Sequence, residues 1–199
     1  MGFSTILDVL GAIVIGGLLL LILLRLNGQM IETNFINGND RSLQRALAET
    51  AVVVEEDLRK MGFCADPFKL TEEMSRVIAA DSSYISFYTD IDSNGELDSI
   101  AYFVSDTNAL SETVNPRDRI LYRQINTDAP FMVNTNVTEF KLIYFDALGF
   151  ELATPVASPS RITHLEISFR VEDPEAYDQK YTQAYWQQVR LTSKNLRKR

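Results

Sequence analysis

A long apolar run at the start of the 199-residue chain limits what the chain can fold into. From Gly2 to Leu24 every residue is apolar or small except Asp8. About 20 such residues in a helix, at about 1.5 Å each, cross the hydrocarbon core of a bilayer. No basic region precedes the run and no small-x-small cleavage site follows it. We therefore predict a retained membrane-spanning helix over residues 1–26, in contact with the lipid bilayer.

Asp8 is the one charged side chain inside this run. An ionised carboxylate in hydrocarbon is costly, so it is expected either to reach the headgroups or to pair with a positive group on a neighbouring helix. Ala12 and Gly16 follow Asp8 at four-residue spacing and offer a small face for close helix approach. Asp8, Ala12 and Gly16 are therefore candidate assembly residues, and the headgroup interpretation stays open.

The composition excludes several kinds of site. The net charge of −8 argues against nucleic acid as a partner, because phosphate binding requires clustered Lys and Arg. The one basic cluster is the terminus 194–199, which we expect to be solvated. A single histidine makes an imidazole-based metal or triad site improbable, and a single cysteine permits no internal disulfide.

A polar segment follows the apolar run. Residues 27–39 are rich in Asn and Gly, which predicts a flexible break in the helix. A second helix should begin with Asn39 or Asp40 as its cap and stop at Gly62. Its apolar positions fall on one face, and we expect that face to pack on a sheet rather than in a coiled coil; they are Leu43, Leu47, Ala51, Val54, Leu58 and Met61.

From Ser83 onward the pattern changes to short alternating stretches separated by Gly, Pro, Asn or Asp. About six antiparallel strands are expected, within residues 83–90, 98–106, 119–126, 137–146, 164–173 and 181–192. Asn94-Gly95 marks a hairpin turn between the first two. The predicted fold class is α+β: a transmembrane helix, then residues 40–199 as a domain whose amphipathic helix packs on an antiparallel sheet.

The stretch DIDSNGELD between the first two strands is a weak calcium candidate. Asp90, Asp92, Asn94 and Asp98 occupy oxygen-ligand positions of an EF-hand loop, but Ala101 stands where the bidentate Glu belongs. The same residue types also build polar hairpin tips, so we favour a plain turn and expect no resident metal or cofactor.

No constellation of residues points to catalysis. The sequence has no glycine-rich phosphate loop and no serine elbow, and Glu55, Glu56 and Asp57 are expected to be solvated on a charged helix flank. We therefore predict that the protein is not an enzyme.

Taken together, the order of these features resembles the minor pilins and pseudopilins of type IV pilus and type II secretion machinery, especially the larger PilW-like and pseudopilin J-like members. The resemblance covers nearly the whole chain. Its motifs are GFSTILD, RALAETAVVVEEDLRKMGF, ISFYTDIDSNGELDSIAYFV, LYRQI, NVTEFKLIYFDALG and VRLTSKNLR.

The resemblance implies roles for particular residues. Gly2 would be the last residue before prepilin-peptidase cleavage and Phe3 the first of the mature chain. Asp8 would act as the family's membrane carboxylate, which pairs with the N-terminal amine of a neighbouring subunit. The partners would then be other pilin-like subunits, with residues 40–199 outside the cytoplasm of a bacterial cell. The alternative is a signal-anchored binding module, calcium-dependent or not, that enters no filament.

Overall fold

The structure is a computed structural model that describes residues 2–70, 75–174 and 181–191. Its contacts divide the chain into two compact units, residues 1–41 and residues 42–199. The first unit is helical throughout its described part, and the second combines the end of the same helix with a sheet.

The helix α1 runs without interruption from Gly2 to Lys60. The expected break at residues 27–39 is therefore wrong, and no second helix starts at Asn39 or Asp40. Gly28 and Gly38 each cost about 1 kcal/mol relative to alanine in a helix interior. Stopping the helix would require a new nucleus, which is more costly than extension, and the segment contains no proline.

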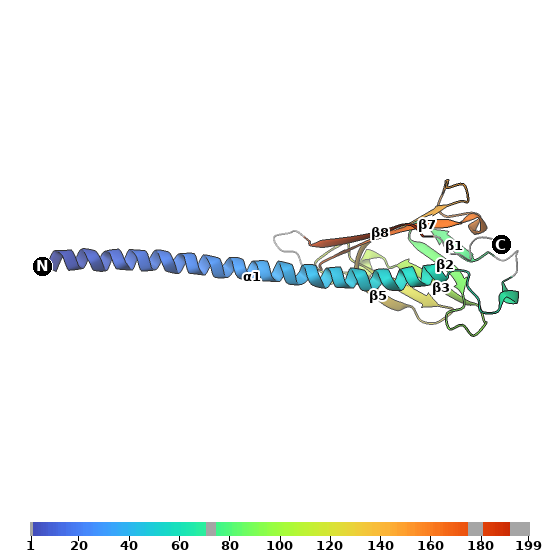
Figure 1. Ribbon diagram of the computed structural model, residues 1–199, viewed down its shortest axis with the longest axis horizontal. Coiled ribbons are helices and arrows are strands. Elements are labelled where there is room, and N and C mark those ends of the chain that lie inside the picture. The colour runs from blue at the N-terminus through green and yellow to red at the C-terminus, as the bar shows by residue number, and fades with distance from the viewer. Residues whose placement is uncertain (1, 71–74, 175–180, 192–199) are drawn as a thin grey trace. The chain divides into compact units, whose positions relative to one another are not determined.

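The second-unit part of α1 lies against the sheet (Figure 1). All six apolar positions expected on its buried face are buried: Leu43, Leu47, Ala51, Val54, Leu58 and Met61. Arg45 pairs with Glu49 on the exposed side of the helix. Gly62, with φ of 70°, follows the helix end and donates its N–H to the carbonyl of Tyr88. The predicted packing of an amphipathic helix on a sheet is confirmed.

Every strand pairing in the described residues is antiparallel, and the sheet order is β1-β2-β3-β4-β5-β7-β8, with β6 beside the end of β5. The strands are β1 (Val77–Asp81), β2 (Tyr84–Thr89), β3 (Asp98–Val104), β4 (Arg119–Ile125), β5 (Phe131–Phe145), β6 (Glu151–Leu152), β7 (His164–Glu172) and β8 (Gln183–Leu191). Short helices η1 (Pro67–Lys69), η2 (Thr107–Leu110) and η3 (Pro159–Arg161) lie in the connections.

The expected strands are present, but β1 and β6 were not expected from the sequence. The fifth strand was expected to start at Val137, whereas β5 begins six residues earlier, at Phe131. The early half of β5 pairs with β4, and the later half pairs with β7. This long strand therefore joins the two halves of the sheet.

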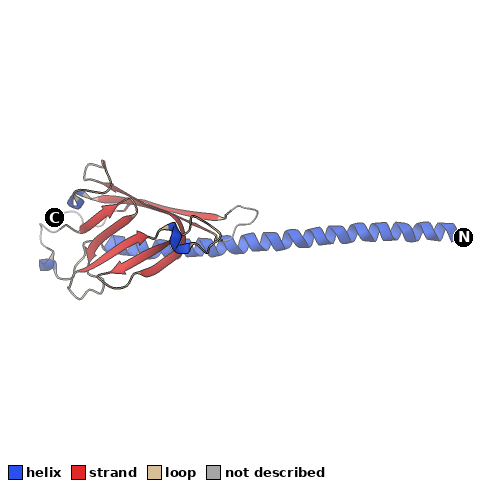
Figure 2. Cartoon of the chain, turned by 180° about the vertical axis from the view of Figure 1, so that it is seen from behind, coloured by secondary structure: helices blue, strands red, loops and turns tan. Residues whose placement is uncertain are grey.

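The sheet is curled, as Figure 2 shows from the opposite side. The N–H of Leu142 in β5 donates to the carbonyl of Ser82 in the turn between β1 and β2. The buried hydroxyl of Tyr144 lies 2.9 Å from the carbonyl oxygen of Asp81 and 3.1 Å from that of Tyr84. Because these contacts connect the first hairpin to β5, they keep the apolar face of the sheet turned toward α1.

Candidate functional site

The first unit exposes an apolar helix surface. One stretch of α1 in the described residues is long and apolar enough to cross a membrane, and none of its most apolar window is buried. The large side chains from Ile6 to Ile31 are all exposed. A soluble protein rarely leaves so long a continuous apolar surface uncovered. By length and composition, the helix is a candidate membrane span.

The predicted assembly residues lie along this helix. Asp8, Ala12 and Gly16 are exposed and follow one another at four-residue spacing, so they occupy neighbouring positions on one side. A Cβ added to Gly16 would meet no atom within 4 Å, so the surface at this glycine is open. Gly2 and Phe3, the predicted processing residues, lie in the first turn of α1.

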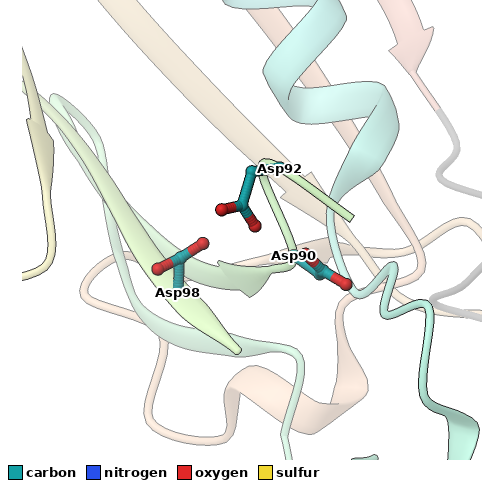
Figure 3. Close-up of side chains that lie close together, drawn as sticks. All are labelled: Asp90, Asp92 and Asp98. Atoms are coloured by element: carbon teal, nitrogen blue, oxygen red, sulfur yellow. The ribbon is translucent and has the colours of Figure 1, made fainter. Parts of the chain in front are cut away.

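The loop between β2 and β3 brings three of the four calcium candidates together. One carboxylate oxygen from each of Asp90, Asp92 and Asp98 lies within 4.8 Å of the other two. Figure 3 shows the carboxylates of Asp92 and Asp98 facing each other, whereas Asp90 extends toward the segment that follows α1. Asn94 is tied to its neighbours instead, because its side-chain amide donates to Asp92 and its oxygen accepts from the N–H of Glu96.

The Asp90 carboxylate stabilises the conformation of the loop between β2 and β3. It is buried, and its carboxylate accepts the backbone N–H groups of Ala65, Asn94 and Gly95 at 3.0, 3.1 and 2.9 Å. Burial raises the pKa of Asp90, but these hydrogen bonds outweigh it, and the pKa lies below the ordinary value of 3.8. Gly95 adopts φ of 85°, which favours glycine at the turn. The residues fit a polar loop organised by one buried carboxylate.

Calcium should leave the melting temperature of the protein unchanged, and Asp92→Ala should be close to neutral. The reason is that Asp90, the buried member of the three, already uses both oxygens on backbone donors. Thermal unfolding of the full chain with and without millimolar calcium tests this. A rise in melting temperature that Asp92→Ala abolishes would show a calcium site, since a ligand of the folded state stabilises it by mass action.

Asp57 contradicts the prediction that the charged flank of the helix is solvated. Its carboxylate accepts the hydroxyl of Tyr102 at 2.6 Å and the guanidinium of Arg123 at 2.6 and 3.3 Å. Asp57 lies three residues after Val54 and four before Met61, so it shares their side of the helix. This spacing could have indicated from the sequence that Asp57 is buried. The identity of its partners on β3 and β4 could not be read from the sequence, because it depends on the fold.

Burial and the neighbouring Asp57 charge raise the pKa of Tyr102, so its hydroxyl remains a neutral donor. The side chains of Asp57 and Arg123 are only 13% and 19% exposed. The group therefore ties α1 to the sheet through a buried ion pair.

A groove of about 420 Å³ lies between α1 and the early half of β5. Its polar side chains bond to one another, because Asn134 donates to the Thr50 hydroxyl and Thr50 donates to the carbonyl of Ala46. Phe131 at its rim is largely exposed. Among the described residues that line the groove, Glu49 is the one titratable side chain, and it is paired with Arg45.

Comparison of the chain with protein-family models, with curated proteins and with solved structures finds no match. The basic terminus 194–199 lies outside the described residues.

Proposed function

We propose that this protein is a structural subunit of a pilin-like filament machine, held in the membrane by α1 and assembled with partner subunits through the same helix. The observation that carries the proposal is the exposed apolar surface of residues 6–26, which contains one carboxylate, Asp8, among side chains suited to lipid or to other helices. The sequence resemblance to minor pilins and pseudopilins gives this surface its proposed partners.

The proposed mechanism is electrostatic. In a bilayer, helices gain little from hydrophobic burial against one another, so small residues and polar pairs determine their association. Asp8 supplies a negative charge that would neutralise the N-terminal amine of a neighbouring subunit. Ala12 and Gly16 allow the two helices to approach closely. The second unit then lies outside the cytoplasm and contributes contacts between subunits.

Asp8→Ala should leave membrane insertion and the fold of the second unit intact while abolishing cross-links to partner subunits. Removing the carboxylate leaves a positive terminus unpaired at low dielectric, which costs far more than at a surface. The measurement uses a photo-cross-linking residue at Ile15, with the captured partners identified by mass spectrometry at matched membrane levels.

Asp8→Glu should retain part of the cross-linking, because the charge is kept and only its reach changes. Asn27→Ala, which removes a polar side chain of the same helix beyond the apolar run, is the matched control and should cross-link normally. Undiminished cross-linking of Asp8→Ala would mean that Asp8 only reaches the headgroups, and the assembly role would be lost.

The second candidate function is a signal-anchored binding module, for which the three neighbouring carboxylates of the loop after β2 are the favouring observation. Sequencing the mature N-terminus separates the two functions. Phe3 at the terminus supports pilin processing, whereas an intact Met1 supports the anchored module.

A further inference from the structure

A second group of acidic side chains lies at the other end of the sheet, where the segment 105–118 leads into β4 and where β7 ends. Three of its polar residues are almost fully buried: Asn115, Asp118 and Glu172 are 1%, 1% and 2% exposed. Asp173, the next residue after Glu172, is also buried. None of these residues stands out in the sequence as a candidate for a site.

Glu172, the last residue of β7, holds the segment through one carboxylate oxygen, Oε2. Its carboxylate accepts the side-chain amide of Asn115 at 3.0 Å and the guanidinium of Arg117 at 2.7 Å. Arg117 also lies 5.5 Å from the ring centre of Tyr181, whose hydroxyl donates to the carbonyl of Val114. The segment is therefore docked by a small number of polar contacts.

Asp118 lies within this docked region but has no such partner. Both of its carboxylate oxygens are buried and accept no hydrogen bond. Burial is the largest influence and raises the pKa of Asp118, and the charges of Glu172 and Asp173 raise it further. The Thr113 hydroxyl and the charge of Arg117 lower the pKa of Asp118, but the net effect of all these groups is still a raised pKa. A buried, unpartnered carboxylate is costly while ionised.

The Arg117 guanidinium and the Thr113 hydroxyl are already engaged. Arg117 pairs with Glu172. The charge of the adjacent Arg119 lowers the pKa of Asp106, but the Nε of Arg119 is buried and has no hydrogen-bond partner, so this cation is the other charged group beside Asp118. The Thr113 hydroxyl lies 2.9 Å from the carbonyl oxygen of Leu110 and 3.2 Å from that of Asn115, so its proton is directed at those carbonyls. Its oxygen keeps capacity to accept a hydrogen bond from a protonated carboxyl.

A divalent cation does not fit this group. Among the residues that the structure describes, the loop after β2 holds the one acidic trio with carboxylate oxygens within 4.8 Å of one another. Glu172 also uses its Oε2 on Arg117 and Asn115. Protonation of Asp118 removes the unpaired negative charge and gives the carboxyl group an O–H donor. A metal ion would not supply such a donor.

We propose that Asp118 makes the segment 105–118 an acid-tightened latch, in which protonation of this buried carboxylate strengthens the docking of the segment on the end of β7. The inference is independent of the proposed function. It concerns local opening of one connection, which can occur at far lower free energy than global unfolding.

The expected pH window follows from the directions of the shifts. A raised carboxyl pKa gives stability that is fully present below the unfolded value of 3.8 and is lost as pH rises through the folded value. Asp106, which accepts the N–H of Asn108 within the segment, has a lowered pKa, so its contribution is lost as the pH falls below about 3.8. Docking should therefore tighten as the pH falls from neutral, and the loss of the Asp106 contribution opposes this tightening below about pH 3.8.

Hydrogen exchange of the full chain in detergent micelles, corrected for the intrinsic effect of pH, tests the latch. In the wild type, protection of the hydrogen-bonded amides of Thr113, Arg117 and Asp118 should rise severalfold between pH 7 and pH 4.5. In Asp118→Asn, protection should already be high at pH 7 and should change little with pH. Asp128→Asn, which changes an exposed carboxylate, should behave as the wild type.

Two results would overturn the proposal. One is that hydrogen-exchange protection of residues 113–118 in the wild type does not change with pH. This measurement uses the wild type alone, so it does not depend on whether a variant folds. The other is an Asp118→Asn protein that keeps the pH response, which would assign the response to Glu172, Asp173 or another group.

Discussion

Val54→Asp should abolish cooperative folding of the second unit, lowering its free energy of unfolding by about 4 kcal/mol or more. Val54 is fully buried on the face of α1 that contacts the sheet, at the centre of the apolar stripe. A carboxylate there would lose its hydration inside the buried apolar cluster. Thermal unfolding of the full chain in detergent, followed by near-ultraviolet circular dichroism of the buried aromatics, measures the effect.

Val52→Asp is the matched control, because Val52 lies two residues away on the same helix and is 55% exposed. It introduces the same charge and the same helix propensity without burying the carboxylate. We expect a change within about 0.5 kcal/mol. Equal effects of the two substitutions would contradict the packing of this face of α1 on the sheet.

Asp57→Ala should destabilise the second unit by about 3–5 kcal/mol, the usual cost of removing one partner of a buried ion pair. The substitution leaves the guanidinium of Arg123 mostly buried without its carboxylate and removes the acceptor of the Tyr102 hydroxyl. Chemical denaturation of the full chain, with the wild type measured beside it, gives the difference in free energy.

Two variants separate the ion pair from general effects on the helix. Glu56→Ala alters the adjacent exposed carboxylate and should be nearly neutral. Tyr102→Phe removes only one hydrogen bond and should cost about 1 kcal/mol. If Asp57→Ala were as mild as Glu56→Ala, the link between α1 and the sheet through Asp57 would not contribute to stability.

The amphipathic helix and most of the strands could be predicted because each depends on a local pattern. The three- and four-residue spacing of Leu43, Leu47 and Val54 identifies a buried helix face wherever that face finds its partner. The hairpin of β2 and β3 follows from alternating apolar residues around Asn94-Gly95. Such local patterns can be recognised without knowing which element the helix or strand packs against, so the sequence alone is sufficient to predict them.

The continuity of α1 and the strand β1 could not be predicted in the same way. Asn and Gly in 27–39 favour a break locally, but a helix already formed on both sides extends at lower cost than it restarts. β1 is a five-residue strand with two alanines, and its pairing with β2 gives it strand structure. In both cases a neighbouring element outweighed the local preference: the helix on either side of residues 27–39, and the strand β2 beside β1.

The candidate sites show the same distinction between features that local sequence determines and features that depend on the tertiary structure. The sequence by itself determined the apolar run, the position of Asp8 within it and the presence of Asp90, Asp92 and Asp98 in one turn, because each of these is a matter of spacing along the chain. Only the tertiary structure decided that Asp57 meets Arg123, 66 residues away, and that Asp118 is buried near Glu172. The energy of a charge depends on its burial and on its partners in space, and neither is fixed until the strands have found their order in the sheet.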